Sequence, residues 1–277
     1  MIRARTASRY ALLSAVTLLA ACSGDDRDPV AEERPPSEIF QSAEAMIERG
    51  GAEEAAFMFE EVERLYPYSQ WAKRAIIMSA YANYQAAQYE ESRSAAQRYI
   101  EFYPSDEDAP YAQYLIALSW YDQISDVGRD QGNTIEALQA LRQMIELYPN
   151  SPYTREAELK FDLTLDHLAG KEMEIGRYYL KRGHFSAAIA RFRAVVEEYQ
   201  TTSHTPEALH RLVESYLSLG LTDEAQTAGA ILGYNFQGSE WYEFSYTRLN
   251  GENLSPAVVG TGWLTRLYRQ VIRGEWL

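Results

Sequence analysis

The chain has 277 residues, and its 26 Lys and Arg against 40 Asp and Glu give a formal charge of −14. So acidic a chain lacks the basic surface that follows a nucleic-acid backbone, which excludes nucleic acid as its partner. A single cysteine excludes an intramolecular disulfide, and 46% hydrophobic residues with only 16 Gly and 10 Pro favour a helical core over disorder or a β-barrel.

Residues 1–21 are predicted to be a signal peptide rather than part of the fold. Three arginines precede the apolar run YALLSAVTLLAA, which at 12 residues is too short to span a bilayer. The run leads into the letters LAAC, which resemble a bacterial lipobox ending at Cys22. An ordinary secretory signal that happens to contain a cysteine is the alternative.

The lipobox resemblance implies that residues 1–21 are removed and that Cys22 carries S-diacylglycerol and N-palmitoyl chains. Three acyl chains exceed the two signals that stable anchoring needs. Ser23 follows the cysteine, and by the bacterial sorting rule it directs a lipoprotein to the outer membrane. We therefore expect a protein that is lipid-anchored on the periplasmic face of the outer membrane. Residues 22–37 are charged, proline-bearing and without periodic hydrophobics, which predicts a flexible tether.

Residues 38–249 carry a repeat that matches the tetratricopeptide pattern. That pattern places small residues at positions 8 and 20 so that two helices approach closely, and a large residue at position 24 between them. The clearest copy, IGRYYLKRGHFSAAIARFRAVVEEY, has Gly176, Ala188 and Phe192 at these positions. Position 20 recurs five times, at Ala55, Ser92, Ala137, Ala188 and Ala225.

Five copies predict an all-α tetratricopeptide-repeat solenoid of about five helical hairpins. Tyr-Pro pairs at 66–67, 103–104 and 148–149 mark the ends of three repeats, because proline stops a helix. Two of the four intervals, of 45 and 51 residues, are much longer than the usual repeat of about 34 residues. Residues 124–133 are interpreted as an insertion in the third repeat, and residues 153–182 as one long helix in the fourth.

Residues 250–277 are predicted to be a linker followed by an amphipathic helix over 263–274. A short capping helix is expected just before them, over residues 241–249. The C-terminal helix has an apolar stripe that begins at Trp263 and Leu264, with arginines beside it. Three roles stay open for it: a cap on the last repeat, a contact with a partner, or docking on a membrane surface.

The chain carries no motif of catalysis, metal binding or cofactor binding. Its four histidines stand outside the spacings of zinc sites, and the sequence lacks GxSxG, P-loop and GxGxxG motifs. The acidic run at 106–108 is interpreted as charge at a helix N-terminus, because it lacks the glycine and the ligand spacing of a calcium loop. We predict a protein that is not an enzyme and has no catalytic residue, metal or cofactor besides the covalent lipid.

A tyrosine-rich face of the first repeats is the candidate peptide groove. A repeat solenoid presents a concave surface suited to binding, and the first helix of each hairpin faces it. The inward positions of these helices are predicted to hold Phe40, Tyr81, Tyr84, Tyr114 and Tyr121. The alternative for each ring is packing against the next repeat.

Three arginines of the fourth repeat, Arg182, Arg191 and Arg193, are the candidate partner-binding residues. Arginine pairs with both oxygens of a carboxylate across an interface, and three of them within 12 residues stand out in so acidic a chain. The alternative is a solvated helix face on which Arg191 or Arg193 pairs with Glu197 or Glu198. Such a pair contributes only about 0.2–0.5 kcal/mol.

Three stretches resemble the BamD (ComL-like) family of outer-membrane assembly lipoproteins. They are FEEVERLYPYSQWAKRA at 59–75, DVGRDQ at 126–131 and DHLAGKEMEIGRYYLKRGHF at 166–185, within a resemblance that covers about residues 38–240. It implies a non-enzymatic component of the machinery that folds and inserts β-barrel proteins into the outer membrane. Its partners would be the POTRA domains of the barrel subunit, the other lipoproteins of the complex, and the C-terminal signals of unfolded outer-membrane protein substrates.

A different class of function competes with that one. The same repeats could form a periplasmic scaffold for peptidoglycan enzymes or cell-division proteins. A chain of that type is expected to carry a coiled-coil segment before its repeats and a signal without a lipobox. This chain has the lipobox and shows no heptads over residues 23–37.

Overall fold

The computed structural model describes residues 34–269. The signal peptide 1–21, Cys22 and most of the tether 22–37 lie outside the described residues, and so does the end of the predicted helix 263–274. Between residues 34 and 269 the chain forms twelve α-helices and no strand. They are α2 (Pro36–Glu48), α3 (Ala52–Leu65), α4 (Gln70–Gln85), α5 (Tyr89–Phe102), α6 (Ala109–Tyr121), α7 (Gly132–Leu147), α8 (Thr154–Lys181), α9 (Phe185–Glu198), α10 (Thr205–Ser218), α11 (Thr222–Asn235), α12 (Glu240–Gly251) and α13 (Trp263–Leu267).

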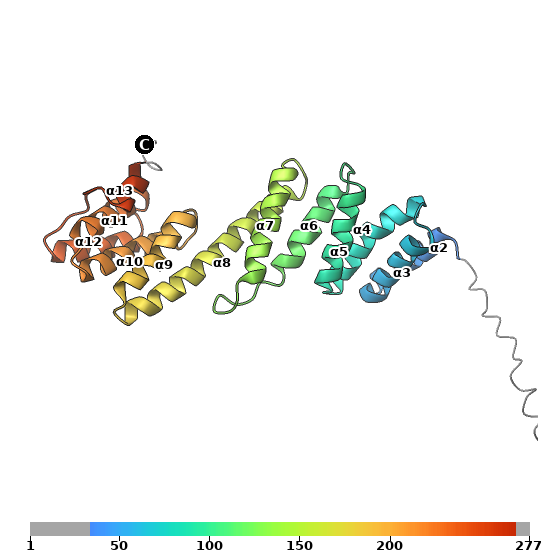
Figure 1. Cartoon of the computed structure of the whole chain (residues 1–277), viewed down its shortest axis with the longest axis horizontal. Helices are drawn as coiled ribbons and strands as arrows, with labels where there is room; N and C mark the ends of the chain where they lie inside the picture. Colours follow the sequence, from blue (N-terminus) through green and yellow to red (C-terminus); the bar gives the residue numbers. More distant parts are fainter. Residues whose placement is uncertain (1–33, 270–277) are drawn as a thin grey trace, which may run out of the picture.

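The first ten of these helices pair in sequence into five antiparallel hairpins, from α2–α3 to α10–α11. The hairpins stack side by side along one axis, and α8 runs obliquely between the first three repeats and the last two (Figure 1). The predicted all-α solenoid of five hairpins is therefore confirmed. The predicted long helix is also present, because α8 continues for 28 residues.

Small residues make the close helix crossing that defines each hairpin. The five residues at repeat position 20 are all fully buried. In the fourth repeat the two helices touch where Gly176 of α8 faces the ring of Phe192 on α9, which is also fully buried. A side chain larger than hydrogen at that glycine would occupy the space of the ring.

An aromatic residue ends the second helix of every hairpin. The C-cap positions of α3, α5, α7, α9 and α11 are held by Tyr66, Tyr103, Tyr148, Tyr199 and Phe236. Each of these rings packs against the hydrophobic cluster of its own repeat. The pattern seen in three Tyr-Pro pairs thus extends to five repeats, and the ring persists where the proline is missing.

The core is divided into four hydrophobic clusters along the solenoid axis. Helix α8 contributes to two of them, with Ala157 in the cluster of the third repeat and Met173 in the cluster of the last two. Between these ends, Leu159 and Leu163 of α8 are each 60% exposed. One helix therefore connects two packed halves, and its middle is the thinnest part of the molecule.

Gly176→Ala should lower the free energy of unfolding by about 1–3 kcal/mol, the usual cost of overpacking a core. A Cβ at this position would lie 2.4 Å from Cε1 of Phe192, in a core that leaves the ring no room to move. Helix propensity alone would favour alanine by about 0.5–1 kcal/mol, so the sign of the change separates the two effects. Urea unfolding followed by circular dichroism measures it.

Gly238→Ala is the matched control, because nothing lies within 4 Å of a Cβ added there and the residue has no left-handed φ. Its free energy of unfolding should stay within about 0.5 kcal/mol of the parent. A Gly176→Ala chain more stable than the parent would contradict the packing described for α8 and α9.

Candidate functional site

Phe40 lies in the core, so its predicted place in a peptide groove is wrong. The side chain is fully buried, with its ring centroid 5.1 Å from that of Phe59 and 5.1 Å from that of Trp71. In the described chain no hairpin precedes α2, so this helix buries its large side chains against α3 and α4.

Tyr114 is also a core residue, and its predicted place in the groove is wrong too. Its ring stacks on Tyr153 with centroids 5.3 Å apart and planes 17° apart, which leaves 5% of the residue exposed. Burial raises the pKa of its hydroxyl. Tyr153 comes from the turn before α8, a contact between repeats that the repeat pattern does not specify.

The other three tyrosines, Tyr81, Tyr84 and Tyr121, are half-buried and keep part of each ring accessible. The hydroxyl of Tyr84 donates a hydrogen bond of 2.5 Å to Asp122, and burial together with this bond raises the pKa of Tyr84. The ammonium of Lys160 lies 4.6 Å from the ring centroid of Tyr121. These rings are held in place and still offer surface to a ligand, so their binding role stays a prediction.

Tyr121 borders a groove at the joint between the third and fourth repeats. Two adjoining hollows of about 460 and 410 Å³ share Asp126, Leu163 and His167, with α8 as their floor and the inserted loop as one wall. We call these two hollows the central groove. The predicted insertion is confirmed, since residues 122–131 separate α6 from α7.

Polar contacts fix the far wall of the central groove to α8. The carboxylate of Asp166 accepts hydrogen bonds from the backbone N–H and the hydroxyl of Ser203, at 2.9 and 2.7 Å. It also lies 3.5 Å from Nε2 of His204. A Cβ at Gly170 would come within 3.2 Å of that same nitrogen, so the glycine lets the α9–α10 turn approach α8 closely.

A second ion pair connects α8 to α10 about three turns further along α8. Arg177 donates two hydrogen bonds, of 2.9 and 2.5 Å, to the carboxylate of Glu207 on α10. Burial alone would raise the pKa of Glu207, but Arg177 and Arg211 together hold it below its usual value. The contact between α8 and α10 thus includes a fixed pair of opposite charges beside its apolar packing.

Sequence reasoning missed Asp166, Arg177 and His204 as residues of a groove. A signal for them was present, because the family-like stretches 126–131 and 166–185 lie far apart in the sequence and meet here. Motif searches overlook this kind of site, since none of its residues has a catalytic or metal-ligating spacing.

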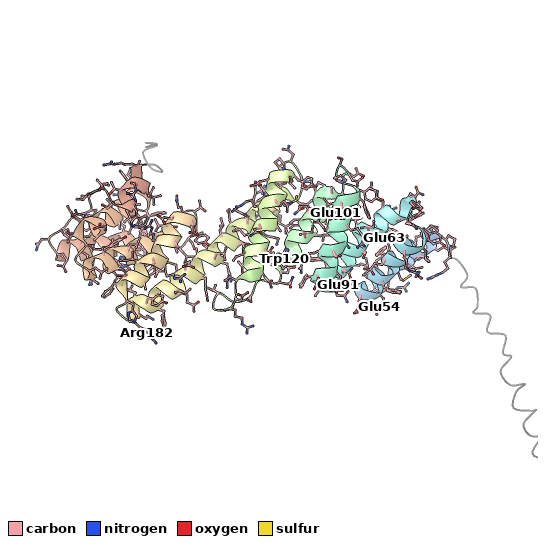
Figure 2. The ribbon with its side chains drawn as sticks, in the orientation of Figure 1. Glu54, Glu63, Glu91, Glu101, Trp120 and Arg182 are labelled. Carbon is pink, nitrogen blue, oxygen red and sulfur yellow. The ribbon has the colours of Figure 1, made fainter. Side chains whose placement is uncertain are left out.

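The three candidate arginines do not form one free patch. Arg191 pairs with Glu172 of α8 at 3.1 Å, and Arg193 pairs with Glu197 at 2.8 Å. The pairing of Arg193 with Glu197 is the solvated-face alternative, while the partner of Arg191 lies on the neighbouring helix. Arg182 is exposed at the end of α8 and stacks over the ring of Tyr178 at 4.3 Å (Figure 2).

The described part of the C-terminal segment packs on the last repeats in the manner of a cap. Leu264 of α13 is 1% exposed and belongs to the last hydrophobic cluster. The indole N–H of Trp263 donates a 2.9 Å hydrogen bond to the hydroxyl of Tyr216, and Arg193 lies 4.6 Å from the Trp263 ring centroid. The predicted short helix before the linker is also present, as α12.

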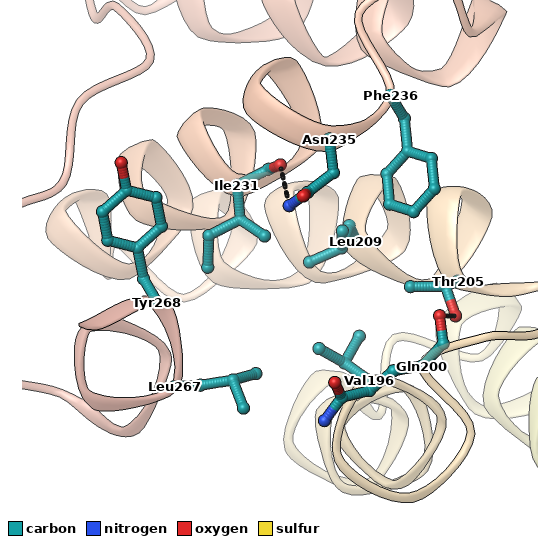
Figure 3. Close-up of a pocket in the computed structure, with 9 residues that line it drawn as sticks. All are labelled: Val196, Gln200, Thr205, Leu209, Ile231, Asn235, Phe236, Leu267 and Tyr268. Atoms are coloured by element: carbon teal, nitrogen blue, oxygen red, sulfur yellow. Dashed lines mark hydrogen bonds between the residues drawn. The ribbon is translucent and has the colours of Figure 1, made fainter. Parts of the chain in front are cut away.

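A small apolar hollow of about 130 Å³ lies where α13 meets α9, α10 and α11 (Figure 3). Leu267 and Tyr268 close one side of it, and Ile231 and Phe236 line the other. The amide of Asn235 donates a 3.1 Å hydrogen bond to the carbonyl of Ile231. We interpret the hollow as the seam between the cap and the last hairpin.

Within residues 34–269, no three His, Cys, Asp or Glu side chains are placed to share a metal ion. Over the same residues, no helix combines the length and the apolarity required to cross a membrane.

Residues 32–231 match the sequence profile of the family YfiO, described as outer membrane lipoprotein. The chain belongs to this family. A relative from Caulobacter vibrioides is 48% identical over 260 residues, covering 93% of this chain and 85% of the relative. A relative from Rickettsia prowazekii is 41% identical over 238 residues, which cover 85% of this chain and 94% of the relative. Both are named outer membrane protein assembly factor BamD.

Among solved structures, a thermophilic TPR protein from Thermus thermophilus is similar with a TM-score of 0.36 and 18% identity, over 77% of this chain and 98% of that protein. Family membership confirms the resemblance drawn from the three stretches at 59–75, 126–131 and 166–185. The names of these relatives describe them as assembly factors.

Proposed function

We propose that this chain is a non-enzymatic lipoprotein component of the machinery that assembles β-barrel proteins in the outer membrane. The observation that carries the proposal is 48% identity, over 93% of the chain, to a protein named outer membrane protein assembly factor BamD. The repeat solenoid supports it, because stacked helical hairpins build extended binding surfaces.

The attachment to the membrane is proposed to be the lipid on Cys22. The family description as outer membrane lipoprotein supports this, together with the lipobox letters LAAC. The anchored chain would lie on the periplasmic face of the outer membrane, with S-diacylglycerol and N-palmitoyl chains in the bilayer.

The two halves of the solenoid are proposed to bind different partners. Substrate C-terminal signals would meet the first three repeats, where Tyr81 and Tyr84 offer partly exposed rings and Tyr121 lines the central groove. The POTRA domains of the barrel subunit would bind the fourth repeat, where Arg182 and Arg191 reach solvent. The long helix α8 lies between the two surfaces and would hold them at a fixed separation.

Affinity purification of the tagged, full-length chain from detergent-solubilised outer membrane tests the proposal. We expect recovery of a barrel protein with POTRA domains and of further lipoproteins. Recovery of peptidoglycan enzymes or division proteins without that barrel protein would support the scaffold alternative and contradict the proposal. A Cys22→Ala chain serves as the control for anchoring, because it should leave the membrane fraction for the soluble periplasm.

Reversing the charge of Arg191 should weaken binding of the barrel subunit more than tenfold. Truncating one partner of a desolvated charge pair lowers the favourable free energy of binding by about 2–5 kcal/mol. A tenfold change in the dissociation constant corresponds to about 1.4 kcal/mol. Arg191→Glu also places a carboxylate beside Glu172, so the variant alone mixes the loss of a partner with an internal repulsion.

The exchange Glu172→Arg with Arg191→Glu separates these two effects. The double variant restores the ion pair between α8 and α9, so binding should stay weak if Arg191 contacts the partner. Arg98→Glu is the matched control, because Arg98 makes a similar pair with Glu63 at 2.8 Å between α5 and α3, and it should bind within threefold of the parent. Recovery of full binding in the double variant would limit Arg191 to an internal role.

A further inference from the structure

One edge of the first three repeats carries large apolar side chains in solvent. Leu65, Phe102 and Leu147 are 45%, 60% and 57% exposed, and the nearby Tyr68 is fully exposed. The first three are the last residues of α3, α5 and α7, so they hold the same place in successive repeats. We call these four residues the apolar edge. The turns that carry them follow one another along the upper border of the molecule (Figure 1).

The last position of the second helix is apolar only in the first three repeats. The equivalent residues at the ends of α9 and α11 are Glu198 and Asn235. Figure 2 shows Glu63 and Glu101 toward the border with the apolar edge, and Glu54 and Glu91 toward the opposite border.

The turns on the opposite border of these repeats contain Arg-Gly-Gly at 49–51, Ala-Ala at 86–87 and Asp-Gln at 122–123. Large apolar residues that hold the same place in three successive repeats form a row on the surface, and such a row indicates contact with an apolar partner.

The start of the described chain lies at the same border. The hydroxyl of Tyr66 donates a 2.8 Å hydrogen bond to the backbone carbonyl of Arg34, which places the first described residues beside the α3–α4 turn. Cys22 precedes Arg34 by 12 residues. At about 3.3–3.6 Å per residue, a lipid on Cys22 lies at most about 43 Å from this turn. The bilayer is therefore within reach of the apolar edge.

We propose that the apolar edge rests on the periplasmic leaflet of the outer membrane. The inference depends on the lipidation of Cys22 proposed above. Leu65, Phe102 and Leu147 would enter the boundary between headgroups and acyl chains, and Tyr68 would lie at headgroup level, where amphipathic rings concentrate. This contact orients the solenoid. A lipid anchor alone lets the folded domain rotate, whereas the apolar edge adds one contact with the bilayer for each of the first three repeats.

The charges near the apolar edge specify the kind of lipid. Lys73 pairs with Asp106, and Arg98 pairs with Glu63 at 2.8 Å, so these two carboxylates are compensated. Three exposed glutamates, Glu101, Glu107 and Glu146, stand beside the edge, against one exposed arginine, Arg64, which lies 3.7 Å from Glu61. Anionic lipids would repel these glutamates. The edge therefore fits a zwitterionic surface better than an anionic one.

Quenching by brominated lipid tests the proposal on the full-length, lipidated chain in phosphatidylethanolamine–phosphatidylcholine vesicles. Cys22 is the only cysteine and is occupied by lipid, so Phe102→Cys or Leu147→Cys gives a single thiol for a fluorophore. Phe57→Cys and Leu219→Cys are the matched controls, because these residues are 69% and 43% exposed and lie away from the edge.

We expect quenching at positions 102 and 147 to exceed that at the controls at least threefold. Adding anionic phosphatidylglycerol to the vesicles should reduce the quenching at positions 102 and 147, because the glutamates beside the apolar edge are repelled by anionic lipid. Equal quenching at all four positions, or none at 102 and 147 while the protein floats with the vesicles, would overturn the contact of the edge with lipid. A chain that fails to float with the vesicles would overturn the lipid anchor and, with it, this orientation.

Discussion

The close crossing of the two helices in each hairpin is the contact on which the rest of this structure depends. It is made by small residues such as Ala55 and Ala188, which are fully buried where one helix meets the next. A hairpin closed in this way still exposes an apolar face on each side, and the neighbouring hairpin must cover it. Stacking follows from that requirement, and an elongated molecule with extended surfaces follows from stacking. The last face is covered by α12 and α13.

The fourth repeat departs from regular stacking, and the departure creates the most polar feature of the fold. Because α8 is 28 residues long, its two ends belong to different hydrophobic clusters. Near its middle, Asp166 accepts a hydrogen bond from Ser203, and closer to its C-terminal end Arg177 pairs with Glu207 of α10. The inserted loop of the third repeat borders the same place, which forms the central groove.

The repeat pattern predicted the hairpins, the insertion and the long helix, because small residues and Tyr-Pro pairs determine local geometry. It did not predict which rings remain accessible. Phe40 and Tyr114 are buried by Trp71 and Tyr153, which come from later elements and lie outside the positions that define the repeat pattern. Likewise Arg191 pairs with a residue 19 positions away on α8, beyond the helical spacing that a single sequence reveals.

The central claim is that the first repeats and the fourth repeat bind different partners across the joint of α8. Photo-cross-linking of a peptide that ends in an aromatic residue, with the barrel subunit's POTRA domains present, tests it most directly. We predict peptide cross-links within residues 40–121 and at the central groove, with POTRA cross-links at α8 and α9. Peptide cross-links confined to residues 180–269 would contradict the division of binding between the two halves.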